Sequence, residues 1–557
     1  MAVRPPRTME RDPSALSKSR FDLVVIGGGI NGAATAREAA LRGLKVALIE
    51  AHDFASGTSS RSSKLIHGGL RYLEQFDFRL VRESRLERRL LRGLAPHLAQ
   101  PLPFLLPIYR GDPYSPLKIR AGLSLYDLLG NLGPEDRHRM LSPGETLQMV
   151  PALRSEGLRA GAVYHDSETD DARLTIEMVI DAAERGAVVV NYTEILALAL
   201  TAQAGKRARD VGTAEARDRL TGRRYEIASR YWVNATGPWV DHVRALVPGF
   251  DGSRTIRLTQ GTHLILPQVA PRHALFAAIP SDQRVFLMLP WNGYSLLGTT
   301  DTDFQGDPSS VCPDPADTEY LLNAVNRVLS RPMTADQVLG SFAGLRALVM
   351  EPGASPSANT REHRLHRDPW ARNLISICGG KLTTARALGE KLVDGIVDRL
   401  EPSPGVAARR HPSRQTAFPG GRTGPFEAFV RASTERAVTE FGLPRKVVER
   451  IVRTYGSRWP LVLELIRESR QLAEPLRGTP TLLAAEVEFS IRHEMAMMLE
   501  DFLLRRSGLN WAACTPAGGE AAPAVAQIFA AHFGWEPERR KAALDNFAKL
   551  ARIAVRE

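Results

Sequence analysis

Three glycines and one acid are the residues whose types and spacing most clearly predict chemistry in this chain. Gly27, Gly29 and Gly32 fit the pattern G-x-G-x-x-G, and Glu50 follows at the end of the next apolar run. A pyrophosphate can lie on the N–H groups at a helix start only where residues without a Cβ let the backbone approach it. A carboxylate at this spacing can accept hydrogen bonds from ribose hydroxyls. The four residues therefore predict a nucleotide site.

The elements around these residues complete a strand–helix–strand unit. Residues 21–26 are an apolar, β-branched run that predicts a buried strand, and residues 33–42 are helix formers followed by Gly43 at the usual cap position. Residues 44–49 predict a second strand. Strand, glycine turn, helix, strand and acid in one unit favour a dinucleotide site over a structural turn. The unit alone does not separate FAD from NAD.

Three further stretches could contact a nucleotide. The first, residues 58–72, begins with the hydroxyl-rich TSSRSSK at 58–64 and ends with HGGLRY at 67–72, which adds backbone donors, a guanidinium and a phenol. Residues 231–237 predict a strand that runs into Ala-Thr-Gly, where small residues leave room for a ligand. Residues 379–384, GGKLTT, offer a helix start to an electron-rich group, although Lys381 could equally be an exposed lysine of the first turn.

Two side chains in predicted strands could act on a substrate. Arg346 lies in the apolar run 342–348, and its burial is costly unless a protein carboxylate or a ligand phosphate meets it. His263 lies in the strand predicted at 255–266 and is a candidate general base, with a satisfied core histidine as the alternative. His67 is a second candidate base, expected closer to the cofactor. Asp170 and Asp171 precede a helical run that one of them could simply cap.

These motifs together resemble the FAD-dependent glycerol-3-phosphate dehydrogenases, a branch of the flavoprotein oxidoreductases related to the D-amino acid oxidases. The resemblance rests on GGGINGA at 27–33, TSSRSSKLIHGGLRYLE at 58–74, FRLV at 78–81, DDARL at 170–174 and GGKLTT at 379–384. It covers residues 21 to about 400 and reaches the C-terminal part only loosely.

The resemblance implies oxidation of sn-glycerol 3-phosphate to dihydroxyacetone phosphate, with hydride transfer to FAD and electron transfer to a membrane quinone. It implies a phosphate clamp of Arg71, Arg346 and Arg361 assisted by Tyr72, and catalytic roles for His263, Arg346 and Lys381. The proline that usually follows the strand arginine of the family is Ala347 here, which could relax that turn.

The expected FAD contacts lie at the glycine turn, the ribose acid and the three later stretches. They are Gly27, Gly29, Ile30, Asn31, Gly32, Glu50, Thr58, Ser59, Ser62, Ser63, Lys64, Leu65, His67, Gly68, Gly69, Ala235, Thr236, Gly237, Gly380, Lys381, Leu382 and Thr383.

The predicted fold class is α/β, with a Rossmann-like FAD-binding domain, an inserted antiparallel-sheet substrate domain similar to that of D-amino acid oxidase, and a C-terminal helical domain. Residues 1–20 are expected to be a disordered basic tail. The oxidoreductase domain spans 21–400, with an FAD part at about 21–100, 166–245 and 340–400 and a substrate part at about 101–165 and 246–339. Residues 401–421 predict a linker and 422–557 the helical domain.

Several local predictions accompany this scheme. Residues 78–94 predict an amphipathic helix whose charges form a mostly solvated face, and the prolines of residues 101–107 predict a break in regular structure. Residues 482–506 predict one helix of a small C-terminal bundle. The helices of this region are expected to pack into the bundle, with membrane contact as the alternative for their basic faces.

Composition limits the partners. The formal charge is +11, which suits a phosphorylated substrate or an anionic lipid surface, but no nucleic-acid fold signature is present, so nucleic-acid binding is not expected. The three cysteines lie far apart in no ligand spacing, which predicts a reducing compartment and no metal. No apolar run is long enough to cross a bilayer. We expect a cytoplasmic protein, peripheral on the cytoplasmic face of the inner membrane; a homodimer is a further arrangement that the sequence leaves open.

Rival functions remain at this point. A glycerol-3-phosphate oxidase would pass the electrons to oxygen, and a related FAD-dependent amino acid oxidase would need an arginine–tyrosine pair for a carboxylate. A basic flavoprotein that associates with nucleic acid without turnover is the reading from another class.

Overall fold

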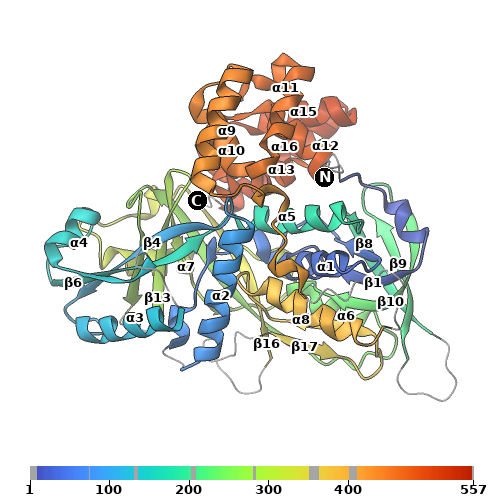
Figure 1. Ribbon diagram of the computed structural model, residues 1–557, viewed down its shortest axis with the longest axis horizontal. Coiled ribbons are helices and arrows are strands. Elements are labelled where there is room, and N and C mark those ends of the chain that lie inside the picture. The colour runs from blue at the N-terminus through green and yellow to red at the C-terminus, as the bar shows by residue number, and fades with distance from the viewer. Residues whose placement is uncertain are drawn as a thin grey trace.

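The computed structural model describes residues 9–73, 76–130, 136–201, 209–279, 284–350, 363–400 and 411–554. Figure 1 shows two sheet-containing parts side by side, with a helical part built from the C-terminal residues above them. The predicted α/β fold with an antiparallel second sheet and a C-terminal helical domain is confirmed.

The first sheet is the nucleotide-binding layer, and β1 lies inside it. The strand order is β17-β18-β10-β1-β2-β7, with β8 and β9 attached to β10, and β1 is parallel to both β10 and β2. Leu23 and Val25 pack into the core beneath α1, α5 and α8, while Val24 and Ile26 pack on the opposite face, which explains the continuous apolar run of β1. The strands are Phe21–Ile26 (β1), Val46–Ile49 (β2), Val188–Val190 (β7), Thr193–Leu200 (β8), Val211–Asp218 (β9), Arg224–Asn234 (β10), Arg364–Arg367 (β17) and Leu374–Cys378 (β18).

The second sheet is mostly antiparallel, as its alternating strands predict. Its order is β15-β11-β14-β13-β12-β4-β6-β3, with β16 paired to β11 and β5 paired to β6. The strands are Leu65–Ile66 (β3), Gln100–Tyr109 (β4), Arg139–Leu141 (β5), Leu158–Glu168 (β6), Ile256–Pro267 (β11), Ala274–Ile279 (β12), Arg284–Trp291 (β13), Tyr294–Gly298 (β14), Thr302–Asp303 (β15) and Gly340–Val349 (β16).

Helices cover both sheets and form the upper part in Figure 1. Those of the oxidoreductase domain are Ile30–Leu41 (α1), Phe78–Leu94 (α2), Pro116–Gly130 (α3), Pro143–Met149 (α4), Asp171–Glu184 (α5), Val240–Ala245 (α6), Pro315–Asn326 (α7) and Ala385–Val397 (α8). Those of the C-terminal domain are Phe426–Phe441 (α9), Arg445–Tyr455 (α10), Trp459–Glu468 (α11), Ala484–Glu494 (α12), Leu499–Arg505 (α13), Pro516–Gly519 (α14), Ala522–Phe533 (α15) and Pro537–Ala554 (α16), with a short hairpin of Pro475–Leu476 (β19) and Thr479–Leu483 (β20).

Two predictions about local structure are wrong. Residues 101–107 do not break the fold, since β4 pairs with β6 from Gln100 to Tyr109. Pro101, Pro103 and Pro107 alternate with other residues, so their missing N–H groups all fall on one side of the strand, and β12, the second neighbour of β4, pairs with it only at Phe104 and Leu105. The single helix expected at 482–506 is two helices, because Met495 adopts a left-handed φ of 53° between α12 and α13.

The helix α2 has the predicted bounds, but several of its charges are buried rather than solvated. Arg386 of α8 donates to both carboxylate oxygens of Glu87 at 2.6 and 2.7 Å. Arg88 donates to Asp166 of β6 at 2.6 Å. These ion pairs form because α2 lies between α8 and the second sheet, where each charge needs a partner.

Two expected domain limits shift. The second sheet continues to Val349, beyond the boundary expected near residue 340, because β16 pairs with β11 along its whole length. The disordered tail expected at the N-terminus is wrong for residues 9–20. Arg11 donates to Asp218 at 2.7 Å, and Leu16 is fully buried beneath β1. Residues 1–8 lie outside the described part of the chain, as do residues 401–410 of the predicted linker.

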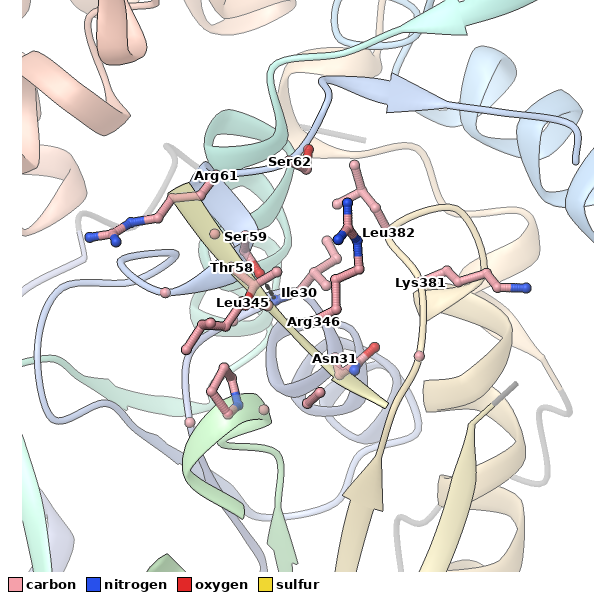
Figure 2. Close-up of a pocket in the computed structure, with 18 of the residues that line it drawn as sticks. Ile30, Asn31, Thr58, Ser59, Arg61, Ser62, Leu345, Arg346, Lys381 and Leu382 are labelled. Atoms are coloured by element: carbon pink, nitrogen blue, oxygen red, sulfur yellow. Dashed lines mark hydrogen bonds between the residues drawn. The ribbon is translucent and has the colours of Figure 1, made fainter. Parts of the chain in front are cut away.

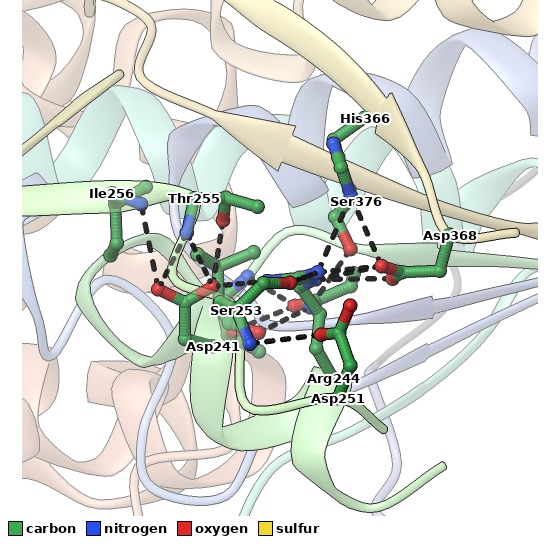
Figure 3. A network of polar contacts seen from close by, with 12 residues as sticks. Asp241, Arg244, Asp251, Ser253, Thr255, Ile256, His366, Asp368 and Ser376 are labelled. Atoms are coloured by element: carbon green, nitrogen blue, oxygen red, sulfur yellow. Dashed lines mark hydrogen bonds and ion pairs between the residues drawn. The ribbon is translucent and has the colours of Figure 1, made fainter. Parts of the chain in front are cut away.

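A buried arginine network joins the start of β11 to the first sheet (Figure 3). Arg244 of α6 donates to Asp368, Asp241 and the Ser253 carbonyl, with its closest contact to Asp368 at 2.6 Å. Asp241 also accepts the N–H of Thr255 at 3.1 Å. This network holds β11 in a fixed direction where it leaves the nucleotide-binding layer, and β11 carries His263 to the site.

Candidate active site

One cavity of about 940 Å³ runs from the glycine turn of the first sheet to the strands of the second. Figure 2 shows part of it, with α1 at one side and Arg346 near its centre. Most of the predicted contacts line it. They are Gly27, Gly29, Ile30, Asn31, Glu50, Thr58, Ser59, Ser62, Ser63, Leu65, His67, Gly69, Tyr72, Ala235, Thr236, Gly237, His263, Arg346, Gly380, Lys381, Leu382 and Thr383.

The glycine turn is packed too tightly for any side chain. Gly27 has a φ of +106°, and a Cβ on it would lie 2.7 Å from the Ala235 carbonyl oxygen. A Cβ on Gly32 would overlap the carbonyl of Gly27, so Gly32 is needed for backbone packing and does not line the cavity. The first turn of α1 can therefore meet a ligand directly.

Glu50 lies at the end of β2, where the sequence places the ribose acid. Its carboxylate accepts the N–H groups of Gly28 at 2.6 Å and His52 at 2.9 Å, and its side chain lines the cavity. Burial raises the pKa of this carboxyl. The two backbone donors orient the carboxylate toward the position that a nucleotide ribose needs.

The hydroxyl-rich segment uses its side chains to hold its own shape. Ser59 Oγ accepts the N–H of Ile30 at 2.9 Å, Thr58 donates to the Leu345 carbonyl at 2.6 Å, and Ser62 donates to Asp171 at 2.6 Å. These bonds tie the segment to α1, β16 and α5, so that the backbone of the segment forms a fixed wall of the cavity.

Lys64 and Gly68 do not line the cavity, unlike their neighbours. Lys64 is 2% exposed, and its ammonium is paired with Asp171 and bonded to the Ser60 carbonyl and to Asn510 at 3.0 Å. Gly68 donates its N–H to Asp166 at 2.8 Å. Lys64 thus serves as an internal counterion of Asp171. An ammonium that is buried needs a carboxylate partner more than a solvent-exposed ammonium does.

His263 reaches the cavity from β11 and is held on several sides. Its Nε2 lies 2.9 Å from Ser63 Oγ, and its ring stacks on Phe342 with centroids 4.9 Å apart and an interplanar angle of 14°. Burial, and then the positive charges of Arg346 and Lys64, lower the pKa of the imidazole to about 3. The ring is therefore neutral at physiological pH, which a general base requires.

Arg346 reaches the same cavity from β16, the strand paired to β11. It donates to Asp301 at 3.0 Å, to Thr299 Oγ1 at 3.0 Å and to the Thr300 carbonyl at 3.1 Å. The protein carboxylate that the sequence left as one alternative is thus present, and the side chain still remains 25% exposed toward the cavity. The side chain of Arg71 and the whole of Arg361 lie outside the described part of the chain.

Lys381, Tyr72 and His67 gather at another wall. The Lys381 ammonium lies 4.0 Å from the centroid of the Tyr72 ring, and the ring of His67 lies 6.0 Å from that of Tyr72. Figure 2 shows Lys381 extending away from Arg346. The structure therefore brings His263 and Arg346 together and places Lys381 on a different side.

Arg61 is a cavity residue that the motifs did not predict. It lies within the TSSRSSK stretch, and its guanidinium donates to the Ala343 carbonyl at 3.4 Å and lies 5.1 Å from the centroid of the Trp511 ring. Within the described part of the chain no carboxylate pairs with it, and burial lowers its pKa to about 10. In Figure 2 it points away from Arg346. The sequence signal that could have identified Arg61 is the position of an arginine within the serine-rich stretch 58–64.

A Rossmann-like sheet, an antiparallel sheet and a cavity between them define a two-domain flavoprotein oxidoreductase. Residues 22–394 match the family described as FAD dependent oxidoreductase, and residues 412–540 match the C-terminal domain of alpha-glycerophosphate oxidase. The second match covers the helical domain, which sequence motifs reached only loosely.

Known proteins that are similar in sequence and structure identify the family within this class of oxidoreductases. The chain is 36% identical over 541 residues to the glycerol-3-phosphate dehydrogenase of Synechocystis sp., covering 94% of this chain and 95% of the relative. It is 35% identical over 563 residues to the aerobic glycerol-3-phosphate dehydrogenase of Bacillus subtilis, covering 98% of each. The X-ray structure of the glycerol-3-phosphate dehydrogenase from Bacillus halodurans complexed with FAD matches with a TM-score of 0.76 and 31% identity, covering 97% of this chain and 96% of that one. This chain therefore belongs to the FAD-dependent glycerol-3-phosphate dehydrogenase family, as predicted.

The residues around the cavity fit the FAD of this family. The glycine turn leaves backbone exposed at the start of α1, and Gly29 caps that helix without any side chain in the way. Glu50 is oriented at the end of β2. The backbones of Ala235–Gly237 and Gly380–Thr383 complete the lining from two other strands. These features accept a dinucleotide that spans both sheets, and the predicted cofactor FAD is confirmed by the family.

Proposed function

We propose that this chain oxidises sn-glycerol 3-phosphate to dihydroxyacetone phosphate and passes the electrons to a membrane quinone. The observation that supports this most directly is the pairing of β11 with β16, which puts a neutral histidine and a guanidinium at the same end of the FAD cavity. Oxidation of a secondary alcohol needs a base for the hydroxyl proton, and a phosphomonoester needs a cationic anchor. The names of the relatives point to the same substrate.

The anchor is Arg346. Its bonds to Thr299, the Thr300 carbonyl and Asp301 fix the guanidinium before substrate arrives, so little side-chain entropy is lost on binding. A planar guanidinium binds phosphate better than an ammonium does. Arg71 and Arg361 complete the clamp in this proposal, and Tyr72 donates a hydrogen bond to it. Binding of the remote phosphate orients the reacting carbon.

The base is His263. Its neutral imidazole accepts the proton of the C2 hydroxyl while the C2 hydrogen leaves as hydride, and Ser63 holds the ring through Nε2. Bound FAD supplies the two-electron acceptor for this hydride. Lys381 acts from the other wall, where its contact with the Tyr72 ring orients the phenol and adds positive charge near an anionic substrate.

Anaerobic mixing of the FAD-loaded protein with substrate tests this function. Glycerol 3-phosphate is expected to bleach the flavin absorbance within seconds, whereas glycerol and D- or L-amino acids are expected to leave it yellow. Bleaching by an amino acid would favour the amino acid oxidase reading. No bleaching by any of these compounds would contradict an oxidation site altogether and favour a binding protein.

The electron acceptor is decided by a second measurement. A quinone analogue is expected to reoxidise the bleached flavin faster than air does, with little hydrogen peroxide formed. Stoichiometric peroxide and slow reaction with the quinone would make the chain a glycerol-3-phosphate oxidase.

A membrane surface is the proposed site of the quinone reaction. No helix in the described ranges is long and apolar enough to cross a bilayer. Most of the exposed large apolar side chains in the described ranges instead belong to α2, to α3 or to the residues just before α2, and these two helices pack on each other. We call this set the α2–α3 patch; it comprises Phe76 at 77% exposure, Leu117 at 76%, Leu128 at 77%, Leu86 at 45%, and Phe78 and Leu125 at 38% each.

The α2–α3 patch fits an anionic lipid surface. Exposed basic residues of the same two helices surround it, including Arg79, Arg82, Lys118 and Arg120. Apolar side chains flanked by cations suit the boundary between acyl chains and anionic head groups. Figure 1 places α3 and the lower end of α2 on the side opposite to the C-terminal helices, which were the earlier alternative for membrane contact.

A recess of about 50 Å³ lies next to the FAD cavity, on the side where α2 packs. Arg79 and Glu83 of α2 line it together with Lys391, and Gly380 and Lys381 line both the recess and the FAD cavity. A quinone that leaves the bilayer at the α2–α3 patch would therefore approach the flavin near Lys381, on the wall away from His263 and Arg346.

A further inference from the structure

The C-terminal domain packs against the oxidation site with an aromatic side chain, that of Trp511. Trp511 lies in a short 3₁₀ helix, Asn510–Cys514, between α13 and α14. Its ring stacks on Phe342 with centroids 5.4 Å apart, and Phe342 in turn stacks on His263 at 4.9 Å; both interplanar angles are 14°. Three nearly parallel rings, from this 3₁₀ helix, β16 and β11, thus form one column that ends at the cavity.

Trp511 is fixed independently of this column. Its indole N–H donates to the Ser60 carbonyl at 3.2 Å, in the wall that also carries Arg61, Ser62 and Ser63. The neighbouring Asn510 donates to Asp170 at 2.9 Å and accepts from Lys64 at 3.0 Å. The C-terminal domain is therefore attached to the cavity wall by both residues.

His263 has few other constraints on its ring. Ser63 bonds one nitrogen, and Gly298 leaves room for the ring edge, since a Cβ there would overlap the imidazole. Only Phe342 is found stacked on a ring face within the described residues, and Phe342 is itself backed by Trp511. Loss of the indole would let Phe342 move back and would open the imidazole to water.

We propose that Trp511 is a positioning residue of the oxidation site, which holds the imidazole plane of His263 through Phe342 and keeps water from its face. Trp511 touches neither FAD nor substrate in this proposal. The proposal rests on the proposed function for its kinetic consequence, and on geometry alone for the enclosure of His263.

The chain offers matched variants for the test. Trp511→Ala removes the support, and Trp511→Phe keeps an aromatic ring behind Phe342. Trp535→Ala is the control, because Trp535 is also 7% exposed in the same buried cluster, but among the described residues its ring contacts are with Phe529 and Phe533 rather than with the rings of the column.

The kinetic experiment measures anaerobic flavin reduction by glycerol 3-phosphate at saturation. Trp511→Ala is expected to lower the rate constant about 10- to 100-fold, the scale of a small misplacement of a catalytic group, with KM and flavin content changed less than about threefold. In the pH profile of this rate constant, the acid limb of Trp511→Ala should move toward the ordinary histidine pKa near 6.5, because entry of water relieves the burial that lowers the pKa of His263. Trp511→Phe should recover most of the rate, and Trp535→Ala should keep it.

A second readout needs no turnover. Acylation of His263 by diethylpyrocarbonate, followed by peptide mass spectrometry, is expected to be several times faster in Trp511→Ala than in the wild type or Trp535→Ala. The proposal would be overturned if Trp511→Ala kept the wild-type rate constant of flavin reduction, the wild-type pH profile and the wild-type acylation rate of His263. It would also be overturned if Trp535→Ala lowered the rate constant as much as Trp511→Ala does. A wild type that glycerol 3-phosphate does not reduce, but in which Trp511→Ala still exposes His263, would refute the proposed function and leave the positioning role standing.

Discussion

At the scale of single residues, Arg346 and His263 divide the work of the site. Both belong to paired strands of the second sheet, and both are held by neighbours before any ligand binds. Their types could be predicted, since an arginine in an apolar strand demands an anion. Their contacts could not, because Ser63, Asp301 and Phe342 come from three separate segments of the chain.

Replacement of Arg346 tests the anchor. Arg346→Ala is expected to raise KM for glycerol 3-phosphate about 10- to 100-fold, since a hydrogen bond to a charged group contributes about 1.5–3 kcal/mol. The KM of Arg346→Lys should lie between those of the wild type and Arg346→Ala, because lysine keeps the positive charge and loses the planar fork of the guanidinium. Steady-state kinetics and flavin absorbance of the purified variants provide the measurement. An unchanged KM, or loss of flavin from Arg346→Ala, would contradict a role in binding substrate.

The pH dependence tests the base. Burial lowers the pKa of His263 to about 3, so the imidazole is neutral above that value and becomes inactive only as pH falls through it. The rate constant of flavin reduction at saturating substrate should therefore show no inflection near pH 6.5. His263→Asn should slow it about 100-fold or more at every pH. A bell-shaped profile centred on an ordinary histidine pKa, unchanged in His263→Asn, would assign the proton to another group.

At the scale of elements, α2 and α3 form the surface that we assign to the membrane. A triple variant of the α2–α3 patch, Phe76→Ser with Leu117→Ser and Leu128→Ser, is expected to lose most binding to vesicles containing anionic lipid. Each apolar side chain contributes about 1.5–3 kcal/mol when fully buried. Cosedimentation with vesicles measures the effect, and flavin reduction by substrate should stay unchanged.

The basic face of α10 provides the control for that experiment. Arg445→Ala with Lys446→Ala removes two exposed cations from the C-terminal domain. These changes should leave vesicle binding intact. If they abolish it while the triple variant still binds, membrane contact belongs to the C-terminal helices instead.

Elements with a strong local signal could be predicted well. The first strand, α2 with its exact bounds, and the glycine turn all follow from residues close in sequence. The strand β4 could not be recognised, because its prolines suit a strand only where the partner strands do not need their N–H groups, and the partners β6 and β12 come from distant parts of the chain. The contact partner of Lys64 was equally hidden, since Asn510 lies more than 400 residues along the chain.

At the scale of the whole molecule, buried ion pairs join the C-terminal domain to the nucleotide-binding layer. Arg173 of α5 binds both carboxylate oxygens of Glu494 at 2.5 and 2.6 Å, and Arg458 binds the same carboxylate at 2.9 Å. Nearby, Arg505 and Arg506 pair with Asp53 at 2.6 and 2.7 Å. The helical domain is thus part of one folded unit with the oxidoreductase domain, and Trp511 is held at the site by the same junction.

Removal of one partner tests this junction. Glu494→Ala leaves the buried Arg173 and Arg458 with only their longer contacts to Glu177, at 3.7 and 3.4 Å, which should lower the free energy of unfolding by about 3 kcal/mol. Glu468→Ala removes an exposed partner of Arg492 and should cost less than about 1 kcal/mol. Denaturant unfolding of the FAD-loaded protein compares the two. Equal stabilities would mean that the buried pairs contribute no more than a surface pair.

The central claim is that one cavity holds FAD, a neutral histidine and a phosphate-binding arginine in a single oxidation site. A crystal structure of the FAD-loaded protein with glycerol 3-phosphate tests it most directly. We predict the phosphate within hydrogen-bond distance of Arg346, together with Arg71 and Arg361, and the C2 hydroxyl next to His263. A phosphate bound elsewhere, with Arg71, Arg346 and Arg361 making no contact with it, would contradict the account.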